Sequence, residues 1–337
     1  MKLDLLPGIV LMVLVAALAR ILSGLLPSAL SEVFVALALG LALANLIGSS
    51  EVFKKFASSA SSGSKLILQL GIVALGARLS FSAVVDVGMQ SILFILICFF
   101  FALTFTLLVA SKLGLTRNLS VLLALGTAVC GNSAIMAASP LLKAKPAEVA
   151  YAVASTTLFG TLAVLSYPVV GQWLALSQTE FGVWAGTAVN DTAQVVATGF
   201  SFGDEAGDTA TIVKLTRNLL IGPVLLVTTW WSVSRIGQAE PSNSTGLRRI
   251  LPKAVPPFVI GFLILAVLKS AGVISDDLST YFGSVGTFLI SMAVAGIGLG
   301  IDVRGLFSIG ARPLITGFAS SIALALLSIS LVTLFWA

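Results

Sequence analysis

Two near-copies of one phrase decide how this sequence is read: GTAVCGNSAIMAAS at Gly126–Ser139 and GTAVNDTAQVVATG at Gly186–Gly199. Each begins with Gly-Thr-Ala-Val and then turns polar, inside segments that are otherwise apolar. Polar groups in apolar surroundings cost free energy unless they find partners. The two phrases therefore mark a place where structure or function requires polar groups.

The rest of the chain has the composition of an integral membrane protein. Of its 337 residues, 58% are hydrophobic and 10% are charged, and the mean hydropathy is +1.08. Soluble domains carry about 25% charged residues. Apolar runs long enough to cross a hydrocarbon core of about 30 Å recur along the chain, and the alternating segments of an outer-membrane barrel do not. We predict an all-α polytopic membrane protein.

Hydropathy predicts about eleven transmembrane helices, at residues 5–26, 31–48, 65–80, 87–110, 118–142, 147–171, 181–200, 209–233, 254–271, 281–301 and 311–336. Many transporters consist of two inverted repeats. We therefore predict a single integral membrane domain with an extra N-terminal transmembrane helix at 1–30 and two inverted five-helix repeats with broken crossing helices, at 31–176 and 177–337.

This register pairs the fifth span with the tenth, so that AVCG at Ala128–Gly131 falls on AVAG at Ala293–Gly296. The GTAV match joins the fifth and seventh spans, which would point the same way. It could be the inverted relation only if one of the two segments were re-entrant.

Loop charge predicts the orientation of the bundle. Four basic residues lie on one side, Arg78, Lys143, Lys145 and Lys269. Twelve lie on the other: Lys2, Lys54, Lys55, Lys65, Lys112, Arg117, Arg235, Arg248, Arg249, Lys253, Arg304 and Arg312. By the positive-inside rule we expect a multi-pass protein of the bacterial inner membrane with a cytoplasmic N-terminus and an external C-terminus. Its net charge of +5 reports topology, and we expect the lipid bilayer, and no nucleic acid, as its partner.

Polar or small residues interrupt the fifth and tenth spans. In the tenth they are Gly296 and Gly298; in the fifth they are Thr127, Cys130, Gly131, Asn132 and Ser133. Interrupted helices in matching places of two halves are typical of a binding site at the bilayer midplane. We predict that these residues bind substrate. The alternative is that the small residues only allow close helix packing.

The seventh and eighth spans carry charge. In the seventh, Asp191 is flanked on one helical face by Asn190 and Gln194. In the eighth, Lys214, Arg217 and Asn218 stand at i, i+3 and i+4. Arginine cannot lose its proton in a protein, so burying it demands an anion or a carboxylate. We predict a net positive cavity for an anion, with Asp191 binding the coupling proton or cation. Alternatively, Lys214 reaches the nearer interface.

Arg78 and Asp302 end the third and tenth spans in the similar phrases LGAR and LGID. Charges at such positions are commonly interfacial anchors, and a gate is the functional alternative.

Taken together, GTAVCGNSA, WAGTAVNDTAQVVATG and VKLTRNLLIGP resemble the YeiH-like sulfate exporter family of bacterial inner-membrane proteins, from about Pro7 to the C-terminus. The resemblance implies the cation:proton antiporter and anion transporter fold group, with inverted five-helix repeats and a core that moves against a scaffold, often in a dimer. Related sequences often place histidine where this chain has Asn190. That departure argues against imidazole-based proton coupling and leaves Asp191 as the titrating group.

Two transport functions fit these residues. The first is secondary active transport of a small anion such as sulfate or a sulfonate; the alternative is cation:proton antiport on the same fold. An enzyme is not expected, because the chain contains no histidine that could act as a base for Ser133. We also expect no metal and no cofactor.

Overall fold

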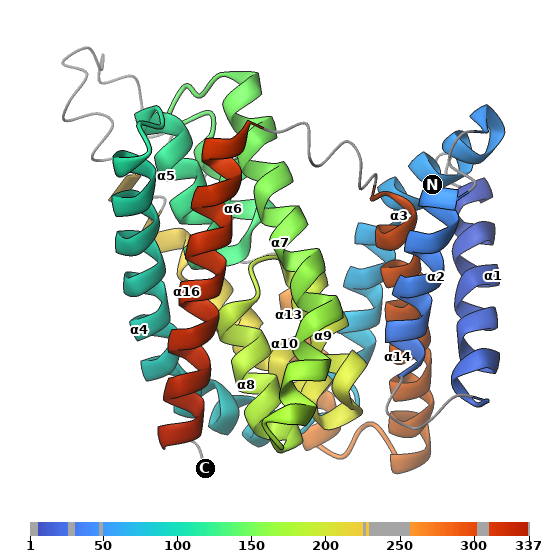
Figure 1. Ribbon diagram of the computed structural model, residues 1–337. Coiled ribbons are helices and arrows are strands. Elements are labelled where there is room, and N and C mark those ends of the chain that lie inside the picture. The colour runs from blue at the N-terminus through green and yellow to red at the C-terminus, as the bar shows by residue number, and fades with distance from the viewer. Residues whose placement is uncertain are drawn as a thin grey trace, which may run out of the picture.

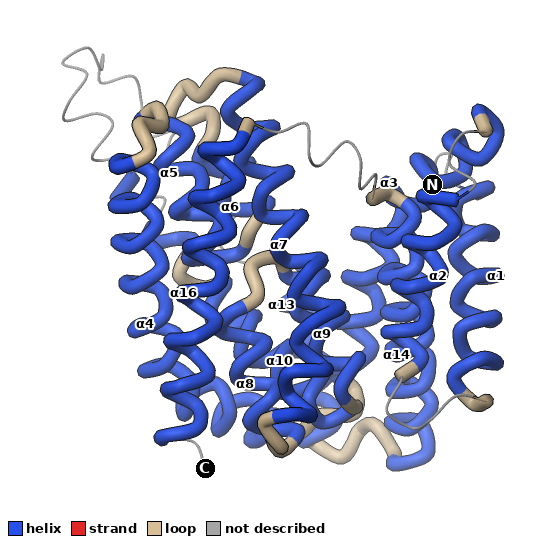
Figure 2. The backbone as a smooth tube through the Cα atoms, viewed as in Figure 1, coloured by secondary structure: helices blue, strands red, loops and turns tan. Residues whose placement is uncertain are grey.

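The computed structural model describes residues 6–25, 31–46, 50–224, 227–228, 257–301 and 310–335. Within these ranges the regular secondary structure is helical throughout (Figure 2). Five of the described helices are long and apolar enough to cross a membrane: α1 (Leu6–Ser23), α4 (Phe81–Lys112), α7 (Pro146–Trp173), α14 (Asp276–Leu299) and α16 (Ala311–Phe335). The prediction of a helical membrane protein is confirmed.

One group of helices, which we call the α3 bundle, packs around α3, and most of it lies on the right in Figure 1. It comprises α1, α2 (Glu32–Leu46), α3 (Glu51–Gly76), α13 (Pro257–Ser270) and α14. Its helices pack at close range because small residues line the contacts. A Cβ atom at Gly40 of α2 would lie 2.5 Å from the Ala295 carbonyl oxygen of α14.

The second group, the hairpin bundle, comprises α4, α5 (Arg117–Leu125), α6 (Asn132–Ala138), α7, α8 (Gln178–Ala188), α9 (Thr192–Phe202), α10 (Asp204–Asn218) and α16. Aromatic side chains fill part of its core. The Trp184 ring stacks on Tyr167 with centroids 4.1 Å apart, and its indole N–H donates to the Ala325 carbonyl of α16.

The second GTAV phrase folds as a re-entrant hairpin of α8 and α9. The chain is extended at Val189 and Asp191, between the two helices. Phe181 near the start of α8 stacks on Phe202 at the end of α9, with ring centroids 3.9 Å apart. A helix continuing across the membrane would separate these two rings by roughly 30 Å. The segment 181–200 therefore returns to the end of the bundle from which it came, and differs from the single span predicted there.

The first GTAV phrase forms a second hairpin. After α5 the chain makes a π-helical turn over Gly126–Cys130, reverses at Gly131 and continues as α6. Glu148 at the start of α7 accepts hydrogen bonds from the Thr116 hydroxyl (2.5 Å) and the Lys145 amide (2.8 Å). The chain after α6 thus comes back to the start of α5, so 118–142 also does not cross as one span. The two hairpins enter from opposite ends of the bundle (Figure 1).

The tenth predicted span is not broken at its glycines. Helix α14 runs without interruption through Gly296 and Gly298 to Leu299. A Cβ atom at Gly296 would lie 2.4 Å from the Met12 sulfur, and one at Gly298 would lie 2.8 Å from the Leu37 carbonyl oxygen. These glycines permit close packing of α14 on α1 and α2. The predicted break of the tenth span at these glycines is therefore wrong, whereas their role in substrate binding stays a prediction.

Charge divides between the two ends of the molecule. The end where α3 and α5 begin, the basic end, carries Lys54, Lys55, Lys112, Arg117, Lys143, Lys145 and Arg312. The predicted spans placed Lys143 and Lys145 on the opposite side of the membrane, with Arg78 and Lys269. Because α6 turns back, both lysines lie at the basic end instead. The other, acidic end carries Glu32, Asp86, Glu180, Asp204, Glu205, Asp208, Asp276 and Asp277, with Arg20, Arg78 and Lys269. Helix α1 begins at the basic end and α16 finishes at the acidic end (Figure 1).

Candidate functional site

The tips of the two hairpins meet inside the bundle. Gly131, at the tip of the first, has φ of 61° and ψ of −125°, a conformation that side chains with a Cβ atom rarely adopt. A Cβ atom there would lie 3.0 Å from the Cα atom of Asp191, at the tip of the second hairpin. Glycine is thus required both by the backbone conformation and by the close approach of the other tip.

Lys214 of α10 ties the two tips together. Its Nζ atom donates to the carbonyl oxygens of Val129 (3.1 Å), Val189 (3.0 Å) and Asn190 (2.5 Å). Three acceptors match the three N–H donors of the protonated amine. The side chain is 0% exposed.

Arg217, one turn further along α10, binds the same two segments. Its Nε donates to the Ala128 carbonyl (2.9 Å), and one terminal nitrogen donates to the carbonyls of Thr187 (2.8 Å) and Val189 (3.2 Å). The other terminal nitrogen donates to the Thr127 carbonyl. Arg217 therefore binds the threonine carbonyl of each GTAV copy, and Lys214 binds the valine carbonyl of each.

These contacts explain why two cations are buried. The last carbonyls of a helix have no partner within the helix, and a helix C-terminus carries about half a negative charge. The π turn and α8 both end at the tips, so Lys214 and Arg217 complete two helix C-termini at once. No ion pair among the described residues involves either side chain. The expected anion or carboxylate partner is replaced by backbone carbonyls, and neither residue lines the cavity described next.

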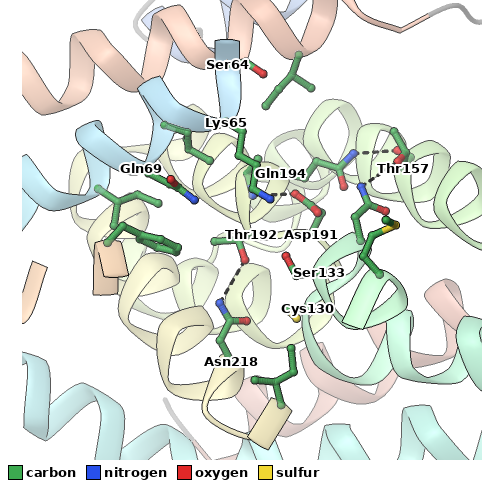
Figure 3. Close-up of a pocket in the computed structure, with 18 of the residues that line it drawn as sticks. Ser64, Lys65, Gln69, Cys130, Ser133, Thr157, Asp191, Thr192, Gln194 and Asn218 are labelled. Atoms are coloured by element: carbon green, nitrogen blue, oxygen red, sulfur yellow. Dashed lines mark hydrogen bonds between the residues drawn. The ribbon is translucent and has the colours of Figure 1, made fainter. Parts of the chain in front are cut away.

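A cavity of about 630 Å³ lies between the hairpin tips and the α3 bundle (Figure 3). Of the predicted substrate residues, it is lined by Cys130, Asn132, Ser133, Gln194 and Asn218. Asp191, the predicted coupling residue, also lines it. Thr127 and Gly131 form the tip behind it. Asn190 points elsewhere, since its amide nitrogen donates to Ser321 of α16 (3.4 Å).

A network of amides and hydroxyls fixes the polar wall of the cavity. The Asn132 amide accepts from the Thr156 hydroxyl (2.9 Å) and donates to the Thr157 hydroxyl (3.3 Å). Gln194 donates to the Thr157 carbonyl (2.8 Å). The side chain of Asn218 donates to the Thr192 hydroxyl (3.3 Å), while its amide oxygen is buried without a hydrogen-bond partner in the described chain. These hydrogen bonds hold the side chains of the polar wall in fixed positions, and they leave the Asn218 amide oxygen without a partner in the described chain.

The opposite wall comes from α3 and includes three polar residues that the sequence analysis did not select as site residues, Ser64, Lys65 and Gln69 (Figure 3). Lys65 was counted as a loop charge because the third span was predicted to start there. The helix in fact begins at Glu51, which places Lys65 in its interior. The i, i+4 spacing of Lys65 and Gln69 was the available signal. Within the described chain, Lys65 and Asp191 are the charged side chains that line the cavity.

Arg78 lies directly after α3, at the acidic end. Its guanidinium group is 2.8 Å from the Asp208 carboxylate and 3.7 Å from that of Asp204, both on α10. The other ion pairs of the described chain stay within the α3 bundle; those of Arg78 join that bundle to the hairpin bundle. A second cavity of about 520 Å³ borders this contact. Asp302, the other predicted gate residue, lies outside the described residues.

Comparison with known proteins identifies relatives along nearly the whole chain. A family model described as "Conserved hypothetical protein 698" matches residues 7–317. A UPF0324 membrane protein of Clostridium tetani is 33% identical over 330 residues, covering 95% of this chain and 94% of the relative. One from Streptococcus pyogenes serotype M18 is 36% identical, covering 97% and 96%. One from Pseudomonas aeruginosa is 31% identical, covering 92% and 89%.

No solved structure matches the chain significantly. The family model and the relatives nevertheless both cover nearly the whole chain, and they therefore support the same family assignment. The chain belongs to the conserved hypothetical protein 698 family of UPF0324 membrane proteins.

Proposed function

We propose that this protein is a secondary active transporter of a small anion, sulfate-like or sulfonate-like, that works by alternating access. The observation that carries the proposal is the meeting of two hairpin tips, inserted from opposite ends, beside a cavity with one polar wall between two helix bundles. Non-helical backbone at membrane depth is tolerated where it is buried in protein or lines a cavity. A cavity at such a place is typical of a transported solute.

The charge around the cavity favours an anion. At the tips, two helix N-termini meet two helix C-termini, so the opposite partial charges of these helix ends largely cancel. Arg217 keeps its charge, Lys214 has the hydrogen-bond pattern of an ammonium group, and Lys65 lines the cavity. Asp191 is the carboxylate that lines the cavity together with Lys65. The remaining excess is positive, and low dielectric surroundings strengthen its attraction for an anion.

Asp191 is the best candidate for the coupling group. One carboxylate oxygen accepts from the Ala193 amide (3.0 Å) and so caps α9, while the side chain lines the cavity. A proton or cation bound there would remove its repulsion of the substrate anion. Coupling through a carboxylate requires no histidine, and the chain contains none.

Alternating access requires the two bundles to move against one another. The polar cavity is bordered by α6 and by the middle of α3, and we assign its opening to the basic end. Arg78 then acts as a latch at the acidic end, where its ion pairs hold the bundles together. By the positive-inside rule the basic end faces the cytoplasm, with the N-terminus inside and the C-terminus outside the bacterial inner membrane. Export of the anion agrees with the resemblance to sulfate exporters.

Counterflow in proteoliposomes tests the proposal. Vesicles loaded with unlabelled sulfate or a sulfonate should accumulate the labelled anion from the medium. Lys65→Met, which keeps the aliphatic stem and removes the charge in the cavity, should raise the half-saturating anion concentration at least about tenfold. Lys55→Met, on the exposed start of the same helix, is the matched control and should leave transport unchanged. Absence of counterflow with every small anion would contradict the proposal.

Cation:proton antiport is the second candidate, and the carboxylate of Asp191 in the cavity favours it. It predicts a Na⁺-dependent or K⁺-dependent proton flux in vesicles without any added anion. The anion transporter predicts no such flux until substrate is present.

A further inference from the structure

The walls of the cavity are polar on only part of their surface. Besides the amides, hydroxyls and charges described above, the cavity is lined by Leu68, Ile72, Cys130, Met136, Ala137, Ala193, Ile221, Pro257, Phe258 and Ile297. Half of the lining residues are therefore apolar. A small inorganic anion is fully hydrated in water and gains nothing from contact with such side chains.

The apolar side chains continue directly from the cation along α3. Lys65, Leu68 and Ile72 all line the cavity and stand at i, i+3 and i+7, the spacing of one helical face. From Lys65 to Ile72 this face is roughly 10 Å long. Phe258 of α13 and Ile221, just after α10, add to the apolar wall. The cavity thus presents a charged region followed by a mainly hydrophobic one, in which Gln69 is the polar residue contributed by α3.

We infer that the substrate is an amphipathic organic anion, with a sulfonate or carboxylate head and a short hydrocarbon body. The head lies between Lys65 and the polar hairpin tips, where the hydroxyl groups of Ser133 and Thr192 can donate hydrogen bonds to it. The body lies along Leu68, Ile72 and Phe258. This inference rests on the proposed transport of an anion and narrows its substrate class.

Burial of a hydrocarbon chain on this wall has a measurable signature. Transfer of each methylene from water to an apolar surface should tighten binding about fourfold. The gain should end when the chain exceeds the length of the wall. The head group contributes equally to every member of a series with the same charge, so chain length isolates the apolar contribution.

Isothermal titration of the purified full-length protein in lipid nanodiscs tests the inference. The probes are sulfate, methanesulfonate, butanesulfonate and hexanesulfonate. We expect Kd to fall about fourfold per added methylene from methanesulfonate to butanesulfonate, and sulfate to bind more weakly than butanesulfonate. Empty nanodiscs provide the background for partition of the probes into lipid.

Variants of the wall separate this inference from the proposed function. Phe258→Ala and Ile72→Ala should flatten the dependence on chain length, whereas Lys65→Met should weaken all sulfonates by the same factor. Phe100→Ala, at a position that is 60% exposed on α4, is the matched control and should change nothing. Sulfate binding as tightly as hexanesulfonate, or a chain-length dependence unchanged in both wall variants, overturns the inference while leaving anion transport intact. Failure of every probe to bind overturns the proposed function as well.

Discussion

The two hairpins share one design up to their tips and differ after them. In each, the carbonyls of Gly-Thr-Ala-Val are bound by the same two side chains, Arg217 and Lys214. Beyond the break, the first hairpin continues with Gly131 and Asn132, and α6 has no side-chain cap. The second continues with Asp191, whose carboxylate caps α9. The shared half of each phrase is therefore structural, and the divergent half carries the chemistry of the cavity.

This difference assigns the two sides of the cavity separate roles. The first hairpin offers the side chains of Asn132 and Ser133 at the start of α6. The second offers a carboxylate. Under the proposed function, the first hairpin binds the anion and the second binds the coupling ion.

Arg217→Met is the strongest test of the structural role assigned to the Gly-Thr-Ala-Val part that the two hairpins share. The variant keeps an unbranched side chain but leaves four buried carbonyl contacts without their donor. Since each buried polar group left unpaired costs about 1–3 kcal/mol, we expect a loss of at least about 3 kcal/mol of unfolding free energy, or failure to accumulate in the membrane. Thermal unfolding in detergent measures it. A variant that is fully stable yet inactive would show instead that Arg217 acts on the substrate.

Gly131→Ala tests whether the tips must touch. The added methyl group meets both an unfavourable backbone conformation and the Cα atom of Asp191, and we expect a cost of about 2–3 kcal/mol. Gly272→Ala is the control, because Gly272 also has a positive φ (72°) but nothing lies within 4 Å of its added methyl group. It should cost about 1 kcal/mol. Equal melting temperatures for the two variants would refute a tight contact between the tips.

Asp191→Asn tests the divergent half. Asparagine caps helices about as well as aspartate, so the unfolding free energy should change little, but the carboxylate proposed to bind the coupling ion is lost. We expect the dependence of transport on a proton or cation gradient to fall at least about fivefold, while exchange of anion for anion continues. Gradient-driven uptake and exchange are compared in the same vesicles. Unchanged gradient dependence would remove Asp191 from the coupling step.

Much of this comparison could be predicted from the sequence, because polar residues in an apolar segment are conspicuous. The GTAV phrases, Asn132, Ser133, Asp191 and Gln194 were selected for that reason, and the cavity is built on the last four. The direction of the chain after each break was not predictable. Hydropathy over 118–142 and 181–200 suits one crossing as well as two half-crossings.

Contacts distant in sequence decide between those two paths, chiefly Phe181 with Phe202 and Thr116 with Glu148. The role of the buried cations Lys214 and Arg217 was equally impossible to predict from the sequence. A lysine or arginine that binds carbonyls looks in sequence like one that binds an anion, and the carbonyls become partners only once both hairpins are in place. Gly296 and Gly298 show the converse, since glycines that suggest a break instead allow close packing.

The smallest expected effect concerns the outer ends of the hairpins. The first hairpin leads from the basic end to the cavity, whereas the start of α10, next to the base of the second, is fastened to the α3 bundle by Arg78. Arg78→Gln should remove about 1 kcal/mol from the latched state, because the guanidinium group is 24% exposed and its pairing is partly screened.

A cysteine at Ser133 reports the latch without any transport assay. In a variant with Cys98 and Cys130 replaced by serine, an impermeant maleimide should label Ser133→Cys faster from the basic end than from the acidic end. Arg78→Gln should raise labelling from the acidic end roughly fivefold. Arg20→Gln, which loosens an ion pair within the α3 bundle only, should not. If Arg78→Gln and Arg20→Gln give the same labelling rate from the acidic end, the ion pairs of Arg78 do not hold the bundles together and apolar packing does. The difference between the two hairpins would then be confined to their tips.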